Sequence, residues 1–293
     1  MNEPNRRASL GMFIASMLIF GTIGILRRYI PLPSAFLAFS RGILGGTFLL
    51  VYARAKKQRA SGWPSPRLLL RLALTGALIG VNWMLLFEAY NHTTVAVATL
   101  CYYMQPVFVV TLSPILFKER LTGKKAACVL MAMIGMALVS GVIGAGGAQG
   151  DTVGILLGLG AAALYAAVIL MNKSIQGVDT YQRTTVQLLS AGIIMAPYLL
   201  LTGGFRGLIF TPSSLLLLLV VGIVHTGIAY ALYFRGMEGL SVQSVAVLSY
   251  IDPVAALLFS AFLLREMLAP SQLVGAVLII GSALASEVNG HRK

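Results

Sequence analysis

Charged residues are scarce in this sequence. Of its 293 residues only 11% are Asp, Glu, Lys or Arg, and nine are acidic. A soluble domain with 58% hydrophobic residues and a mean hydropathy of +0.86 would leave large apolar patches in water. This composition therefore excludes a soluble globular protein. The Lys and Arg residues stand between apolar runs and form no basic stripe with interleaved aromatics, so we expect no nucleic-acid partner.

Cysteine and the motifs of common catalytic and metal sites are also scarce or missing. The two cysteines, Cys101 and Cys128, fall at opposite ends of successive apolar runs, which favours packing roles over a disulfide. No H-E-x-x-H motif or other ligand spacing predicts a metal, and we expect no cofactor. A G-x-x-x-x-G-K-[ST] loop is absent, which argues against direct coupling to ATP.

The abundant feature is a series of apolar runs of about 20 residues, the length at which a helix crosses the hydrocarbon core of a bilayer. They predict an all-α integral membrane protein with ten transmembrane helices. The first follows Arg6 and Arg7, and it is too long for a signal peptide. The predicted ranges are about 10 to 30, 34 to 53, 68 to 90, 94 to 117, 124 to 143, 152 to 172, 180 to 201, 213 to 235, 241 to 264 and 270 to 287.

The distribution of basic residues between these runs predicts the orientation. With the N-terminus inside, 17 Lys and Arg residues lie in cytoplasmic segments, only four lie in outer segments, and Arg41 lies within a helix. The positive-inside rule then places both termini in the cytoplasm of a multi-pass inner (plasma) membrane protein. The inner residues are Arg6, Arg7, Arg54, Lys56, Lys57, Arg59, Arg67, Arg71, Lys118, Arg120, Lys124, Lys125, Lys173, Arg183, Arg235, Arg292 and Lys293.

The sequence also contains an internal repeat. Residues 87–121 align without a gap to residues 234–268, at an offset of 147, and the alignment matches Pro106 with Pro253 and Glu119 with Glu266. The Gly-rich stretch Gly144 to Gly150 marks the joint, so we expect two five-helix repeats, 1–147 and 148–293, that form one transport domain. Because five is odd, equivalent helices must cross in opposite directions. Inverted repeats are typical of secondary transporters, in which the halves exchange inward-open and outward-open states.

The chain resembles the drug/metabolite transporter superfamily in its EamA-type ten-helix branch. The resemblance rests on Phe20-Gly21, Arg28, Pro33 and Arg41, on Tyr165-Ala166 with Lys173, and above all on the duplicated segments Pro106 to Glu119 and Pro253 to Glu266. It implies a central cavity between two repeats and export or exchange of small metabolites, and amino-acid exporters of the YddG type are a similar subgroup. Phe20 stands where that family usually has Trp.

The repeat places two polar-Pro pairs near the middle of the membrane, Gln105-Pro106 and Asp252-Pro253. Proline cannot donate its backbone nitrogen, so we expect kinks that leave the carbonyls of Tyr102 and Ser249 without helical partners. Each proline is read equally well as a packing kink or as a hinge that lines the cavity.

Asp252 is the most informative of these residues. A carboxylate at a helix centre costs roughly 2.5 to 3.5 kcal/mol on insertion scales, and such groups are usually functional. The low dielectric favours the neutral carboxyl, which can carry a coupling proton, and the charged form can bind a substrate ammonium. The alternative is a structural role, either as a neutral carboxyl or as a paired ion that locks helices together, for example with Arg41 or His225. Gln105, its repeat partner, cannot titrate, so proton coupling would be asymmetric.

Several further polar and aromatic residues lie within predicted spans. We favour a structural role for Arg41, which can snorkel or pair across helices. Glu119 and Glu266 are read as salt bridges or gate latches at helix ends. Close packing within the protomer is expected for Gly76-x-x-x-Gly80 and Gly154-x-x-x-Gly158. The predicted substrate site comprises Asn82, Trp83, Tyr102, Tyr103, Gln105, Tyr165, His225, Tyr230, Tyr250 and Asp252, with Pro106 and Pro253 as hinges.

These patterns predict a secondary transporter that exports small metabolites such as amino acids by alternating access through a central cavity. Its partners would be the small-molecule substrate, the lipid bilayer and protons, in a monomer or homodimer. An intramembrane enzyme is an alternative, but it needs a nucleophile-base pair, paired carboxylates or metal ligands at one depth. A channel or receptor is a further alternative that the repeat does not exclude. We do not expect an enzyme.

Overall fold

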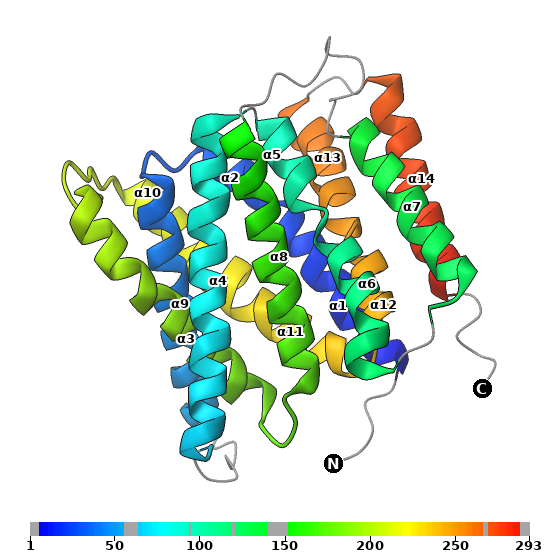
Figure 1. Cartoon of the computed structure of the whole chain (residues 1–293). Coiled ribbons are helices and arrows are strands. Elements are labelled where there is room, and N and C mark those ends of the chain that lie inside the picture. Colours follow the sequence, from blue (N-terminus) through cyan, green and yellow to red (C-terminus); the bar gives the residue numbers. More distant parts are fainter. Residues whose placement is uncertain are drawn as a thin grey trace.

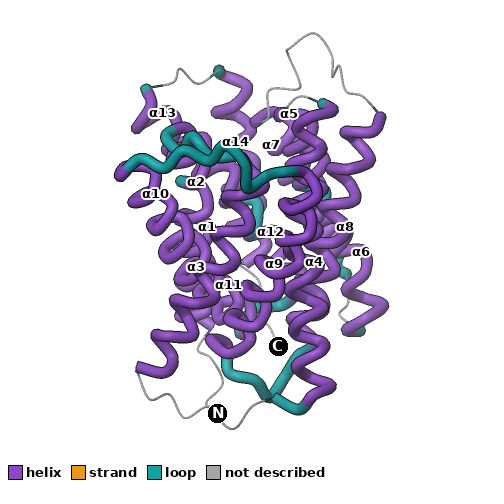
Figure 2. Tube along the Cα trace, turned by 90° about the vertical axis from the view of Figure 1, so that its left-hand side faces the viewer, coloured by secondary structure: helices purple, strands orange, loops and turns teal. Residues whose placement is uncertain are grey.

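The computed structural model describes residues 6–55, 64–93, 95–118, 121–139, 152–265 and 269–287. Within these ranges the chain contains helices joined by short connections, and no β-strand. The helices run roughly along one direction, and the described loops lie at the two ends of the bundle (Figure 2). Glu119, Glu266, the stretch Gly144 to Gly150 and the C-terminal Lys293 lie outside the described residues. The latch role predicted for the two glutamates therefore remains a prediction.

Helical segments occupy each of the ten apolar ranges, but several ranges hold more than one segment. In the first half these are α1 (Arg6–Gly21), α2 (Ile23–Arg28), α3 (Ser34–Ala55), α4 (Pro66–His92), α5 (Val95–Tyr102), α6 (Gln105–Phe117) and α7 (Gly123–Val139). In the second half they are α8 (Thr152–Ser174), α9 (Thr180–Thr202), α10 (Pro212–Gly222), the π-helix η1 (Ile223–Ile228), α11 (Ala229–Glu238), α12 (Val242–Leu248), α13 (Ile251–Leu264) and α14 (Pro270–Glu287).

Seven of the described helical stretches are long and apolar enough to cross a bilayer. The remaining stretches are shorter: α1 stops at Gly21 and α2 resumes at Ile23, α7 has 17 residues, and the apolar part of α14 covers Pro270–Ala285. The chain is thus a multi-pass helical membrane protein. The seven stretches are Ala35–Ala55, Pro66–Ala89, Val97–Phe117, Thr152–Ser174, Thr180–Thr202, Pro212–Glu238 and Val242–Leu263.

Both predicted proline kinks fall where one α-helix ends and the next begins. The residues between α5 and α6 and between α12 and α13, such as Met104 and Tyr250, keep right-handed helical angles, and Pro106 and Pro253 fall in the first turn of the second helix. Proline is tolerated there because the first turn does not need its N–H. The Ser249 carbonyl oxygen, which Pro253 cannot serve as a helical partner, accepts from the Asp252 N–H at 3.3 Å instead.

A π-helical turn, η1, interrupts the eighth predicted span between α10 and α11. Such turns place an extra residue in the helix and often mark functional positions. η1 packs closely on α3, because a Cβ at Gly45 of α3 would lie 2.9 Å from the Gly227 nitrogen of η1. The sequence gives no periodicity signal for this turn, which positions His225 and Thr226.

Small residues bring the long helices into close contact. A Cβ at Gly76 of α4 would lie 2.3 Å from the Gln187 carbonyl oxygen of α9, and one at Gly154 of α8 would meet Thr93 at 2.7 Å. The two predicted Gly-x-x-x-Gly motifs therefore pack within the chain. Further extensive pairings join α1 to α11, α4 to α8, and α3 to α9.

The helices α7 and α14 lie side by side at one edge of the bundle (Figure 1). Gly135 and Gly275 face each other there, because a Cβ on either would approach the carbonyl oxygen of the other within 2.7 Å. The outer face of this pair is exposed, as Leu130 and Val277 show. In Figure 1, α1 begins and α14 ends at the same, lower end of the bundle, where α8 also turns into α9.

Candidate functional site

Aromatic rings from four helices form a continuous cluster inside the bundle. Tyr230 and Tyr233, one turn apart on α11, lie at its centre. Phe20 of α1 contacts Tyr230 edge-to-face with ring centroids 5.1 Å apart, and Trp83 of α4 does so at 6.3 Å. The ring of Tyr165 of α8 lies 6.5 Å from that of Tyr233. This cluster joins elements from both halves of the sequence.

The cluster continues to the interruption between α5 and α6. Tyr165 stacks on Tyr102 with centroids 5.9 Å apart, and Tyr102 contacts Tyr103 at 5.7 Å. Tyr103 in turn stacks on Tyr250 at 6.2 Å, next to the interruption between α12 and α13. The predicted aromatic site residues are therefore in mutual contact, from Trp83 at one end to Tyr250 at the other.

Asp252 lies at the Tyr250 end of this cluster and is half-buried. The Tyr103 hydroxyl donates to the Asp252 Oδ2 at 2.9 Å. The Tyr250 hydroxyl donates to the Tyr103 carbonyl oxygen, also at 2.9 Å. Two hydrogen bonds thus join the first half of the chain to the second at this position. The alternative in which Asp252 pairs with Arg41 or His225 is wrong, because its carboxyl bonds to Tyr103 and those two residues bond elsewhere.

Arg41 of α3 lies at the opposite end of the cluster. Its guanidinium carbon lies 5.0 Å from the centroid of the Trp83 ring, and its Nε donates to the Thr226 Oγ1 at 3.0 Å. Of the two expectations for Arg41, the structure shows pairing across helices and not snorkelling, since the side chain turns inward onto an aromatic face, where a cation is attracted by the ring. Arg41 therefore lies against the aromatic cluster, although it is not among the predicted substrate-site residues.

The π-helix η1 positions the groups that hold Arg41. Thr226 donates its hydroxyl to the Val221 carbonyl oxygen at 2.9 Å, so its oxygen accepts from Arg41. The neighbouring His225 Nε2 lies 2.7 Å from the Thr22 Oγ1, and Thr22 itself donates to the Ile19 carbonyl oxygen. Because that threonine proton is already used, His225 donates from Nε2. His225 thus ties η1 to the interruption between α1 and α2, and it does not join the ring cluster.

Asn82 and Gln105 are buried polar residues beside the cluster. Asn82 Nδ2 donates to the Ala161 carbonyl oxygen at 2.6 Å and so fastens α4 to α8. Among the described residues, the Asn82 Oδ1 and the Gln105 Nε2 have no hydrogen-bond partner. Buried polar atoms normally have one, so these two atoms are available to a polar ligand or to water.

The structure adds Phe20, Arg41, Thr226 and Tyr233 to the predicted set. A signal existed for Tyr233, which follows Tyr230 by three residues and therefore shares its helix face. Phe20 was part of the family resemblance, although it was not assigned to the site. Thr226 could not be found, because its direction depends on the π-helical turn. Within the described ranges no three His, Cys, Asp or Glu side chains are grouped so as to hold a metal.

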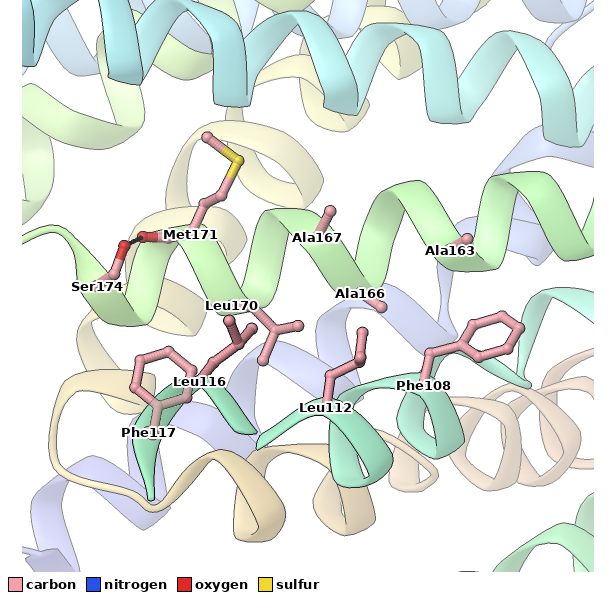
Figure 3. A pocket seen from close by; sticks show the side chains of 10 residues that line it. All are labelled: Phe108, Leu112, Leu116, Phe117, Ala163, Ala166, Ala167, Leu170, Met171 and Ser174. Carbon is pink, nitrogen blue, oxygen red and sulfur yellow. Dashed lines mark hydrogen bonds between the residues drawn. The ribbon is translucent and has the colours of Figure 1, made fainter. Parts of the chain in front are cut away.

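A separate apolar groove of about 490 Å³ runs between α6 and α8. Figure 3 shows Phe108, Leu112 and Leu116 of α6 facing Ala166 and Leu170 of α8 across it. None of the predicted substrate-site residues lines this groove. The groove and the aromatic cluster are therefore two distinct features.

Comparison with known proteins identifies relatives along nearly the whole chain. The EamA-like transporter family model matches twice, over residues 7–141 and 152–286. An uncharacterized transporter of Bacillus subtilis, YxxF, is 29% identical, and the alignment covers 88% of this chain and 82% of that protein. A protein of Escherichia coli named as a probable amino-acid metabolite efflux pump is 30% identical over 67% of this chain and 68% of its own.

The fold also has a counterpart among solved structures. One crystal structure superimposes with a TM-score of 0.84 at 23% sequence identity, and the match covers 96% of this chain and 98% of that one. At this identity the likeness concerns the fold alone. The whole described bundle, and not one half of it, is shared with that protein.

Proposed function

The chain belongs to the EamA-like transporter family, and on this premise we propose that it is a secondary transporter that exports amino acids or related small metabolites by alternating access. The observation that carries the proposal is the aromatic cluster with a cation at one end and a carboxyl at the other. Ring contacts run from Trp83, which lies beside Arg41, through Tyr230, Tyr233, Tyr165 and Tyr102 to Tyr103, which bonds to Asp252. The family is one of transporters and not of enzymes.

This arrangement suits a zwitterionic amino acid. A guanidinium forms strong, bidentate hydrogen bonds with a carboxylate, so Arg41 would receive the substrate carboxylate. The rings beside Arg41 would contact the ammonium group and the side chain of the substrate. The name of the Escherichia coli relative supports this substrate class. That name describes the Escherichia coli protein, and the assignment of the same substrate class to this chain is our proposal.

We further propose ten transmembrane helices arranged as two inverted five-helix repeats, 1–147 and 148–293, with both termini in the cytoplasm. The two matches of one family model, one in each half, support this division. So do the helix pairs, because α1 with α11 and α4 with α8 are equivalent contacts under an exchange of the halves. Reporter fusions at the C-terminus test the orientation, and a periplasmic C-terminus would contradict it.

The contacts between Tyr103, Tyr250 and Asp252 would act as a latch in the transport cycle. They join the halves at the two helix interruptions, where Pro106 and Pro253 remain the proposed hinges. Protonation of Asp252 removes the charge that favours the Tyr103 bond, and this links the latch to a coupling proton. A proton-coupled cycle is thus part of the proposal.

The decisive experiment measures flux in proteoliposomes that contain the purified full chain. A panel of labelled neutral, acidic, basic and aromatic amino acids is offered together with organic cations, at several pH gradients. We expect saturable flux of at least one amino-acid class and its loss in Arg41→Ala. A well-folded protein that moves organic cations but no amino acid would overturn the substrate assignment. Flux without saturation would favour a channel.

A further inference from the structure

The groove between α6 and α8 opens on the lipid-facing surface of the bundle. Leu112 and Leu116 on α6 are 42% and 58% exposed, although they line it. On α8, the small residues Ala163, Ala166 and Ala167 line the recess, and Ala166 faces the large side chains of α6 (Figure 3). An open apolar recess at membrane depth is filled by hydrocarbon and not by water, since water would find no polar partners there.

The length of the groove matches one leaflet. Both helices run in the same direction along it, from Phe108 and Ala163 at one end to Phe117 and Ser174 at the other (Figure 3). From residue 163 to residue 174 the helical rise is about 16 Å, roughly half of the 30 Å hydrocarbon core. A single extended acyl chain fits these dimensions, whereas a transmembrane helix of a partner would cover both leaflets.

Two basic side chains lie at the Phe117 and Ser174 end. Arg71 of α4 is exposed and its Nη2 donates to the Ser174 Oγ at 3.3 Å. Lys118 follows Phe117 directly and is also exposed. Among the residues that the structure describes, no acidic side chain forms an ion pair with either of them. In the proposed orientation this end faces the cytoplasm, and the cytoplasmic leaflet carries the anionic lipids.

We propose that this groove is a binding site for one anionic phospholipid of the cytoplasmic leaflet. An acyl chain occupies the recess between α6 and α8, and the phosphate lies between the guanidinium of Arg71 and the ammonium of Lys118. The site is separate from the aromatic cluster, so the proposal does not depend on the substrate or the direction of transport.

Native mass spectrometry of the detergent-purified full chain tests the site. The protein is incubated with equimolar phosphatidylglycerol and phosphatidylcholine that carry identical acyl chains, and retained lipids are counted. We expect one retained phosphatidylglycerol in strong preference to phosphatidylcholine. Removal of each charge should lower the preference about fivefold, the effect of one basic residue near an anionic surface. The double variant Arg71→Gln/Lys118→Gln should thus lose nearly all of it.

Two matched controls separate the groove from the rest of the surface. Arg54→Gln removes an exposed basic residue at the end of α3 and should leave the preference unchanged. Ala163→Trp fills the groove and should lose the retained lipid of either kind, whereas Leu156→Trp, 63% exposed on the same helix but outside the groove, should keep it. Size-exclusion profiles and helical content confirm that each variant is folded. An unchanged lipid preference in the double variant, or equal retention in the two tryptophan variants, would overturn the proposal.

Discussion

Each half of the chain contains one interrupted helix, and the two interruptions lie at equivalent positions. Their backbones are similar, but their side chains make different contacts. The first lies between α5 and α6, before Pro106, and the second between α12 and α13, before Pro253. The two later segments even end alike, because Lys118 and Arg265 both adopt φ 55°. The offset between these last two residues is the 147 residues of the sequence repeat.

The side chains at the two interruptions make different contacts. In the first half, Gln105 is 2% exposed, and its Nε2 has no hydrogen-bond partner among the described residues. Its counterpart Asp252 is half-buried and accepts a hydrogen bond from Tyr103. The Tyr250 hydroxyl bonds to a backbone carbonyl and not to a side chain. A repeated backbone thus provides two similar pivots, while only one of them carries a group that can be charged.

The largest effect that we predict is that of Asp252→Asn. Asparagine keeps the shape and can accept from Tyr103, but it cannot release a proton. We expect normal expression and folding, with net proton-coupled transport lowered about 100-fold, the value of a strong charged hydrogen bond. Exchange of substrate across the membrane can survive if only the proton step is lost. Flux at several pH gradients checks this.

A swap variant sharpens the same comparison. Gln105→Asp with Asp252→Gln moves the carboxyl to the other half while the composition stays nearly constant. Because the Tyr103 hydroxyl donates to residue 252 and the Tyr250 hydroxyl to the Tyr103 carbonyl oxygen, we expect that a carboxyl at position 105 does not restore transport. Recovery would show that the halves are functionally equivalent. A single variant Asp252→Asn with unchanged affinity, rate and pH dependence would show that the carboxyl is a structural group.

The second effect concerns the opposite end of the aromatic cluster. Arg41→Ala removes the cation from Trp83 and Thr226, and amino-acid substrates should lose their carboxylate partner. We expect the KM for amino acids to rise about tenfold to 100-fold, while Arg41→Lys restores part of the loss because it keeps the charge but not the planar fork. Arg54→Ala, which removes an exposed arginine of the same helix, is the control. An equal KM change in both variants would contradict a site role.

The third effect is a contrast between the two tyrosines. Tyr250→Phe removes the hydroxyl that donates to the Tyr103 carbonyl oxygen, and the loss of this part-buried bond costs about 1 kcal/mol of stability. Tyr103→Phe removes the donor to the Asp252 carboxyl in an equally part-buried bond, so we expect a similar loss of stability but a larger loss of transport. Melting temperatures in detergent and flux measurements distinguish the two. An equal loss of transport rate in both variants would contradict a special role of the bond to Asp252.

The positions of the helices were largely predictable from the sequence, and the site only in part. Apolar runs bounded by charge located the helical ranges, because hydrophobic length is a strong signal. The helix interruptions were foreseen only as kinks, since the sequence shows that Pro106 and Pro253 lack a donor but not whether the chain starts a new helix. The π-helical turn at Thr226 was not foreseen, because one additional residue in a turn leaves no pattern in hydrophobicity.

Arg41 shows why the remaining site residues were missed. A basic residue within an apolar run can extend to the membrane surface or turn inward, and the choice depends on partners from other helices. Here Trp83 and Thr226, from two other segments, draw it inward. Asp252 was identified without such information, since a lone carboxyl at membrane depth is rare enough to be informative by itself.

The smallest predicted effect tests whether the two halves share backbone strain as well as shape. Lys118 and Arg265 lie in the left-handed region, which costs a residue with a side chain about 1 to 2 kcal/mol relative to glycine. Glycine relieves this strain but adds freedom to the unfolded chain, worth roughly 0.5 to 1 kcal/mol. Lys118→Gly and Arg265→Gly should therefore each stabilise the protein slightly and by similar amounts. The β-branched replacements Lys118→Val and Arg265→Val should each destabilise it. Melting temperatures in a neutral detergent check all four variants, and opposite signs in the two halves would mean that the ends of α6 and α13 resemble each other only in outline.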